Sequence, residues 1–244
     1  NLGDPLGRAA HGRNLSLPED LAPVSGMDVA RNVARVLHPD YLAAVGFWAL
    51  GRTLRLQVHR VLSIALEGAS AAEEPPSGLR FVAVRNAGEL RNMGQGLEDQ
   101  LNEESGPSCR SILDAGGSLY ALAEGEQVAC QLNIRRGVVA VDSPTKLTLS
   151  FPDGSAFLDF LHTRDDYRGR GLATALIRYA CGDIARVGTR SCLAHVRATN
   201  HSSLRAFRRC GWERRAAIFT TRSGRFLAAP GCRQAGMDVD PAGS

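Results

Sequence analysis

The most informative stretch of the chain covers residues 157–176 and reads FLDFLHTRDDYRGRGLATAL. Its first part is apolar and aromatic enough for a strand, and a polar loop follows Thr163. From Leu172 onward, apolar residues recur at three- and four-residue steps, as expected for a helix. Glycines at positions 169 and 171 would let backbone N–H groups approach a ligand, beside the positive end of that helix. The stretch therefore predicts a strand, a phosphate-binding turn and a helix.

Positive charge is concentrated in the same part of the chain. The 244 residues carry a net charge of +4. Residues 164–225 hold 14 basic and 4 acidic residues, a balance of +10, whereas residues 76–163 hold 7 and 11, a balance of −4. A local basic field is the usual sign of an anionic ligand. The glycine turn and the charge thus indicate the same kind of ligand.

Several other functional classes are disfavoured. The turn lacks the G-K-[ST] ending of a P-loop and does not match G-x-G-x-x-G. The six cysteines include no C-x-x-C pair, so we expect no metal site and no disulfide framework, but reduced thiols in a cytoplasmic protein. The longest uncharged apolar run, residues 41–51, is far shorter than the ~20 residues that cross a bilayer.

The pattern divides the chain into four parts. We expect a loose segment over residues 1–25, a helical extension with a linker over 26–77, an α/β domain over 78–229 and a mobile tail over 230–244. In the extension, apolar residues at three- and four-residue steps predict a helix from Pro39 to about Leu66. In the domain, the sequence predicts strands at 80–85, 119–123, 128–134, 146–151, 157–163, 192–197 and 212–219, and helical segments at 87–113, 172–187 and 202–210.

A second motif follows the glycine turn. Residues 200–212 read N-x-x-S-x-x-A-F-x-x-x-G-W, in which Asn200 is suited to cap a helix. The two motifs together resemble the GNAT (N-acetyltransferase) superfamily of acyl-CoA-dependent acyltransferases, with the similarity extending over about residues 78–229. The resemblance implies an α/β GNAT fold: a mixed, mostly antiparallel sheet splayed at its centre, with helices on both faces and here preceded by the helical extension.

The resemblance also implies a cosubstrate, acetyl-CoA, and the residues that bind it. The glycine turn would hold the pyrophosphate, the backbone at the end of the 157–163 strand would bind pantetheine, and the second motif would form the helix beside it. The implied binding residues are Leu161, His162, Thr163, Arg168, Gly169, Arg170, Gly171, Leu172, Ala173, Asn200, Ser203 and Phe207.

For catalysis the resemblance points to Asp159, at a position where many relatives carry Glu. Asp159 is a candidate base or amine anchor whose pKa apolar neighbours would raise, and the alternative is a paired structural carboxylate. His162 is the competing base, whereas His195 is expected to be a packed core residue. Phe207 stands where many relatives place a Tyr general acid, and it has no proton to donate. What replaces that tyrosine is left open.

The leading hypothesis is an N-acetyltransferase acting on a primary amine of a small molecule or a protein. The acidic cluster Glu98, Asp99, Glu103 and Glu104 either attracts a cationic amine or forms a solvated helix face. The alternatives are a longer-chain N-acyltransferase and a non-catalytic acyl-CoA-binding module. The helices expected in the extension are candidates for a homodimer or partner contact, and the few aromatics among the arginines disfavour nucleic-acid binding.

Overall fold

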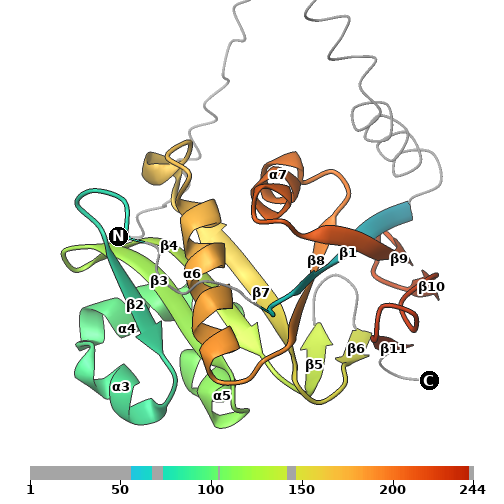
Figure 1. The fold of residues 1–244 in the computed structure, drawn as a ribbon, viewed down its shortest axis with the longest axis horizontal. Coiled ribbons are helices and arrows are strands. Elements are labelled where there is room, and N and C mark those ends of the chain that lie inside the picture. The colour runs from blue at the N-terminus through green and yellow to red at the C-terminus, as the bar shows by residue number, and fades with distance from the viewer. Residues whose placement is uncertain (1–55, 68–73, 104, 142–146, 242–244) are drawn as a thin grey trace, which may run out of the picture. The chain divides into compact units, whose positions relative to one another are not determined.

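The computed structural model describes residues 56–67, 74–103, 105–141 and 147–241, all within the unit Ala43–Ser244. The loose segment expected over residues 1–25 lies outside the described residues, as do most of the helical extension, Glu104 and the last three residues of the expected tail. Figure 1 shows the described part in colour.

Within this part, two sheets form the framework. The large sheet has eight strands in the order β10-β9-β1-β8-β7-β4-β3-β2. Its pairs are antiparallel except for β7 and β8, which run parallel. The strands of this sheet are β1 (Leu56–Ala65), β2 (Arg80–Val84), β3 (Ser118–Glu124), β4 (Gln127–Arg135), β7 (Ser155–Thr163), β8 (Ser191–Arg197), β9 (Glu213–Thr221) and β10 (Phe226–Ala228). A small sheet contains β5 (Val138–Val141), β6 (Leu147–Ser150) and β11 (Asp238–Pro241) in the order β11-β6-β5.

Helices cover both faces of the large sheet, as Figure 1 shows from one side. On one face, α6 (Leu172–Arg186) and α7 (His201–Arg209) bury their apolar sides against the middle of the sheet. On the other face, α3 (Ala87–Asn92), α4 (Gln95–Glu103) and α5 (Cys109–Asp114) cover β2, β3 and β4. The small sheet covers the remainder of that second face and packs on β1, β8 and β9. This arrangement confirms the predicted α/β fold with a mostly antiparallel sheet.

Most elements predicted within the domain are present. The hairpin predicted near residues 119–134 is formed by β3 and β4, which pair antiparallel. The helix after the glycine turn is α6, in which Leu176, Ile177 and Ala180 are fully buried. In α7 the Asn200 side chain caps the helix, as predicted, by accepting a hydrogen bond from the Ser203 N–H.

The helix predicted up to about Leu66 is wrong over its described part. Residues 56–65 form β1, which lies between β8 and β9 near the centre of the large sheet. Both faces of β1 are covered, because Leu62 packs in the core beneath α6 and Val61 packs in the core beneath the small sheet. The domain start at residue 78 remains a prediction, although the sheet includes this earlier strand.

The mobile tail predicted from residue 230 is also wrong, as far as residue 241. Cys232 and Met237 are 2% and 1% exposed and belong to the core beneath the small sheet. Residues 238–241 form β11, which pairs with β6 in register from Asp238↔Ser150 to Pro241↔Leu147. The tail therefore closes the small sheet.

Candidate active site

The parallel strands β7 and β8 separate along their length, as the resemblance implied. They pair from Ser155↔Ser191 to Leu158↔Ala194, and no pairing follows. On the side facing β8, the backbone after Leu158 therefore has no strand partner, whereas its other side still pairs with β4. This gap exposes a strand edge that an extended ligand could use for hydrogen bonds.

A bulge in β7 lies where the strands part. Phe160 has a φ of +49°, and the pairing with β4 shifts between Gln131 and Asn133. The extra residue reverses the faces of the strand beyond it. Leu158 packs in the core beneath α6, and the Thr163 hydroxyl lies 3.1 Å from the Cys130 sulfur of that same core, so both residues face α6. The ordinary alternation of faces along a strand is therefore broken at Phe160.

The first cavity of the site, which we call the glycine-loop groove, lies between the end of β7, the N-terminus of α6 and α7. Its volume is ≈ 720 Å³. Ten of the twelve predicted acetyl-CoA-binding residues line it: Leu161, His162, Thr163, Arg168, Gly169, Gly171, Leu172, Ala173, Asn200 and Ser203.

The groove has the properties of an anion site. Gly169 and Gly171 have φ values of 82° and 78°, which a side chain would disfavour, and Gly171 is the N-cap of α6. The first N–H groups of a helix have no intrahelical acceptor, so they are available to a ligand. Arg168, Arg205 and Arg209 also line the groove. The exposed Arg168 lies 2.7 Å from the exposed Asp165, a contact that water screens strongly.

Two predicted binding residues lie elsewhere. The guanidinium of Arg170 lies 5.0 Å from the centre of the Tyr167 ring, and Arg170 does not line the groove. Phe207 is buried, with its ring in edge contact with Trp212 at 4.8 Å between centroids. Phe207 lines the neighbouring cavity instead.

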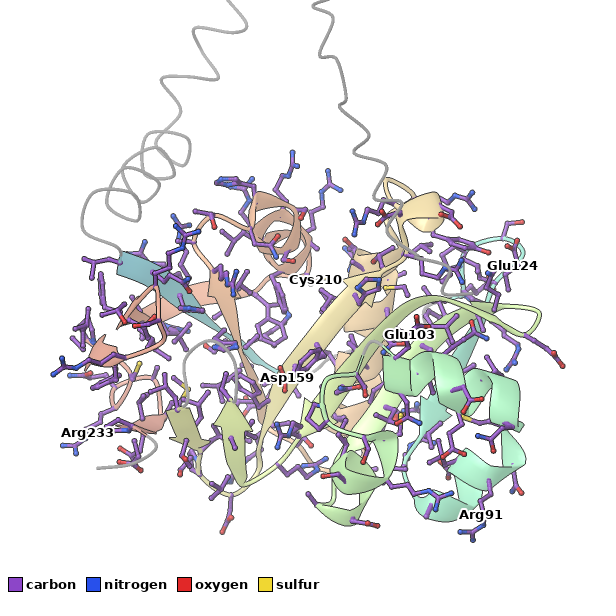
Figure 2. All side chains as sticks on the ribbon, turned by 180° about the vertical axis from the view of Figure 1, so that it is seen from behind. Arg91, Glu103, Glu124, Asp159, Cys210 and Arg233 are labelled. Atoms are coloured by element: carbon purple, nitrogen blue, oxygen red, sulfur yellow. The ribbon has the colours of Figure 1, made fainter. Side chains whose placement is uncertain are left out.

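That neighbouring cavity, the Asp159 cavity, has a volume of ≈ 560 Å³. Figure 2 shows Asp159 between the α4–α5 side of the molecule and the strands β5 and β6. The cavity shares Leu161, Asn200 and Ser203 with the glycine-loop groove. The two spaces are therefore adjacent and meet where β7 leaves β8.

Asp159 has polar partners that the sequence did not indicate. One carboxylate oxygen accepts a hydrogen bond from the Phe160 N–H at 3.0 Å, and the other lies 3.5 Å from Nη1 of Arg135. The Arg135 guanidinium also donates to the Ala140 carbonyl oxygen at 3.1 Å. The side chains of Asp159 and Arg135 are 12% and 16% exposed, so the pair is largely shielded from solvent.

Two histidines stack in the wall of the Asp159 cavity. The rings of His59 and His195 lie 5.3 Å apart at an angle of 26°. Burial, followed by the charges of His195 and Arg197, lowers the pKa of His59 to about 3. Burial also lowers the pKa of His195, although Asp159 opposes this effect. Both imidazoles are therefore neutral at neutral pH.

Sequence reasoning missed most of this wall. The sequence predicts a helix around His59 and a packed core position for His195, and it does not single out Arg135 or Arg197. All four line the Asp159 cavity. Only the pairing of β1 with β8 brings His59 beside Arg197 and His195, and the sequence does not predict β1.

The two catalytic candidates line different spaces. His162 lines the glycine-loop groove and a smaller cavity of ≈ 230 Å³ beside Cys130 and Gln131, whereas Asp159 lines neither. The structure therefore does not bring Asp159 and His162 together in one cavity.

The described part of the acidic cluster lies outside the Asp159 cavity. Glu98 is buried and lies 3.5 Å from Arg110, and Asp99 accepts a hydrogen bond from Gln95. Glu103 lines the smaller cavity that His162 also lines. None of these three carboxylates is placed to receive an amine at Asp159.

No tyrosine from the described part of the chain lines the Asp159 cavity. The hydroxyl of Tyr120 donates to Asp183 at 2.8 Å, and that of Tyr167 donates to Glu124 at 2.6 Å. Tyr179 stacks on Phe81 with a centroid distance of 4.0 Å. The proton donor missing at Phe207 is therefore not supplied by any of these three.

Two other kinds of site are absent from the described residues. None of the helices there is long and apolar enough to cross a membrane. No group of three or more His, Cys, Asp and Glu side chains there is arranged to hold a metal ion.

Among known proteins, the chain is similar to acetyltransferases. No curated protein matches the chain significantly. Among solved structures, a GCN5-related N-acetyltransferase from Sphaerobacter thermophilus is 18% identical, over 70% of this chain and 53% of that chain, with a TM-score of 0.48. A GCN5-related N-acetyltransferase from Kribbella flavida is 18% identical, over 75% of this chain and 63% of that chain, with a TM-score of 0.44. An acetyltransferase from the GNAT family from Colwellia psychrerythraea is 12% identical, over 67% of this chain and 55% of that chain, with a TM-score of 0.46.

The chain thus spans between about half and two thirds of the length of these structures. Residues 98–212 match the model of the acetyltransferase (GNAT) family. The matched region includes the bulged strand β7, the glycine turn and α7, which are the elements that form the glycine-loop groove. Over residues 98–212 the chain is therefore similar to the acetyltransferase (GNAT) family.

Proposed function

We propose that the protein is a cytoplasmic N-acetyltransferase that transfers the acetyl group of acetyl-CoA directly to a primary amine. One observation supports this most strongly. The glycine-loop groove and the Asp159 cavity meet at Leu161, where the edge of β7 is unpaired. A cosubstrate in the groove and an amine in the cavity would approach each other at that point.

The groove suits acetyl-CoA on chemical grounds. The positive end of α6 and the backbone of Gly169 and Gly171 favour a pyrophosphate. Arg168, Arg205 and Arg209 add charge that a polyanion would attract. The unpaired edge after Leu158 offers N–H and C=O groups to the amide-containing pantetheine arm.

When bound, acetyl-CoA supplies an activated thioester carbonyl. The amine nitrogen forms a bond to the carbonyl carbon, the carbon–sulfur bond breaks, and the thiolate leaves. A backbone N–H on the free edge of β7 would stabilise the negative charge that develops on the carbonyl oxygen. The ammonium form of the amine must lose a proton before it attacks, and Asp159 is the carboxylate in the cavity that can accept it.

One observation favours the non-catalytic alternative. Phe207 lines the Asp159 cavity without a hydroxyl, and the described tyrosines lie elsewhere. A thiolate is a good leaving group and can take its proton from water, so the missing hydroxyl slows transfer without preventing it. A pure binding module would instead bind acetyl-CoA without any turnover.

Calorimetric titration with acetyl-CoA, followed by thiol-release assays with a panel of primary amines, tests the proposal. We expect binding at micromolar concentrations and amine-dependent thiol release. Binding without release on any amine would favour the non-catalytic module. Release with long-chain acyl-CoA in preference to acetyl-CoA would favour the longer-chain alternative. Absence of CoA binding would contradict all three.

A further inference from the structure

The wall of the Asp159 cavity carries more positive than negative charge. Arg135 and Arg197 line it with two guanidinium charges, and Asp159 contributes one carboxylate, which leaves one positive charge. The histidines of the wall are neutral, because burial lowers the pKa of both. The charge of Arg135 is already matched, since its guanidinium lies 3.5 Å from Asp159 and donates to the Ala140 carbonyl oxygen.

Arg197 is the unmatched charge. It is exposed at the end of β8, beyond the point where β7 leaves that strand. In the described part of the chain, no carboxylate lies within ion-pair distance of its guanidinium. A cation without a partner at the wall of a cavity attracts an anionic group of the ligand.

A second, independent feature lies directly beside Arg197. His59 of β1 is the cross-strand partner of Arg197, so the two side chains stand next to each other on the same face. His59 is 3% exposed, and its Nε2 has no hydrogen-bond partner within the described chain. A buried polar atom without a partner costs free energy, which a ligand oxygen would recover by accepting a hydrogen bond from an Nε2–H.

We propose that the acceptor amine also carries a carboxylate, as an amino acid does, and that Arg197 binds this carboxylate with His59 beside it. The proposal rests on the N-acetyl transfer proposed above and names its substrate class. The amine would face Asp159 on β7 and the carboxylate would face Arg197 on β8, so the substrate would bridge the gap between the strands.

The same charges disfavour a polyamine. A second ammonium group in the cavity would meet Arg197 without a carboxylate to compensate it, because Glu98, Asp99 and Glu103 lie elsewhere. The selectivity for anionic over cationic acceptors would therefore depend on one side chain, which a single substitution can test.

The test uses amino acids with several side chains, each paired with its primary amide and its decarboxylated amine. For each amine, kcat/KM of acetyl-CoA thiol release is measured with the full chain. We expect kcat/KM to be about 10–100-fold higher for the amino acid than for its amide or its decarboxylated amine. This is the range that one charge-assisted hydrogen bond gives. The amide is the stricter control, because its amine is less basic and is therefore more often unprotonated at the same pH.

Four variants connect this preference to Arg197. Arg197→Gln should lower kcat/KM for amino acids about 10–100-fold. For the decarboxylated amines, kcat/KM should change by less than about twofold. Arg197→Lys should restore part of the loss, and Arg197→Glu should shift the preference toward diamines. Arg222→Gln is the matched control, because Arg222 is exposed and lines none of the cavities described above. Thermal unfolding of each variant checks that the fold is intact.

A binding measurement provides a readout without turnover. N-acetylated amino acids are titrated into the protein in the presence of CoA, and Arg197→Gln should weaken their binding about tenfold or more. If CoA binds but amides or diamines react as well as amino acids, this inference is wrong and the acetyltransferase proposal stands. If CoA binds but the protein neither acetylates an amino acid nor binds its acetylated form, the inference is likewise wrong. If CoA does not bind at all, both proposals fail.

Discussion

His59 makes folding stability sensitive to pH. Its pKa is about 3 in the folded protein and about 6.5 when exposed, so the unfolded chain binds the additional proton between these values. The contribution of His59 to the free energy of unfolding is therefore fully present above pH 6.5, and it is lost as the pH falls toward 3. Linkage predicts a loss of about 2 kcal/mol in the free energy of unfolding between pH 6.5 and 5 from this group alone.

The substitution His59→Phe isolates this contribution. Phenylalanine keeps a ring against His195 but takes up no proton, so the difference in unfolding free energy between wild type and variant should change by about 2 kcal/mol over that interval. Urea denaturation at pH 5 and pH 7 measures it. Parallel stability profiles for the two proteins would show that His59 is not responsible.

Asp159 carries the proposed proton transfer. Asp159→Asn keeps an oxygen that can accept the Phe160 N–H but removes the base, so kcat should fall about 10²–10⁴-fold with the affinity for acetyl-CoA unchanged. A rise in amine KM at constant kcat would instead make Asp159 an anchor for the substrate.

His162→Gln is the comparison for Asp159→Asn. His162 lines the glycine-loop groove, so its substitution should change the KM for acetyl-CoA more than kcat. A larger loss of kcat in His162→Gln than in Asp159→Asn would exchange the two proposed roles.

For individual residues, the sequence shows which residue types are present but not which contacts they make in the folded protein. It shows that Asp159 is an acid among apolar residues of a strand, but the contact of Asp159 with Arg135 depends on β4 and β7 lying side by side. The bulge is invisible in the sequence, because phenylalanine rarely has a positive φ. The ring of Phe160 occupies the position that a Cβ on Gly106 would need, so the bulge depends on a glycine far away in the sequence.

Among the elements, α6 and its glycine turn offer the clearest test. A Cβ on Gly171 would meet no atom within 4 Å, so Gly171→Ala would be penalised only for its left-handed backbone, by about 1–2 kcal/mol. Relaxation of that backbone would also turn the first N–H groups of α6 away from the groove. We expect weaker acetyl-CoA binding by about tenfold, measured by calorimetry, and a lower denaturation midpoint.

Gly96→Ala is the matched control. Gly96 lies in α4 without a positive φ, and a Cβ added there would also meet no atom within 4 Å, so alanine should stabilise the protein by up to about 1 kcal/mol. Its affinity for acetyl-CoA should not change. Equal effects of the two substitutions on binding would contradict the role given to the turn.

The elements differ in how clearly the sequence encodes them. The helix α6 buries one side, so its apolar residues repeat with the helical period. The strand β1 is covered on both faces, which removes the alternation of apolar and polar residues that identifies a strand. Val58 and Val61 are both buried there and are three residues apart, which imitates a helical stripe.

For the molecule as a whole, the small sheet links the C-terminal region to the Asp159 cavity. Met237 is 1% exposed in the core that also contains Val139 of β5, and Val141 of the same strand lines the cavity. Met237→Ala should therefore reduce the free energy of unfolding by about 2–4 kcal/mol. It should also raise the amine KM more than the acetyl-CoA KM.

Denaturation and steady-state kinetics measure these two effects of Met237→Ala. Leu227→Ala is the control, because Leu227 is 46% exposed in β10 and its truncation should change stability by less than about 1 kcal/mol. Equal losses of stability in the two variants would contradict the buried role of Met237.

The general fold could be predicted because two local motifs identify it, but the arrangement of the sheets could not. The strand β11 reads Asp-Val-Asp-Pro, which has little strand character, and only its pairing with β6 orders it. The strand β1 likewise gains its structure from β8 and β9. Contacts between residues so far apart in the sequence leave no local pattern to find.

The position of β1 has a consequence for how the protein folds during synthesis. The ribosome makes this strand before the rest of the large sheet, yet its two neighbours, β8 and β9, follow α6 and are made late. At about 5–20 residues per second, β1 waits for many seconds without a partner. Sheets closed by such distant segments fold slowly, and their unpaired edges favour aggregation. Chaperones that hold exposed strands should therefore raise the yield of native protein.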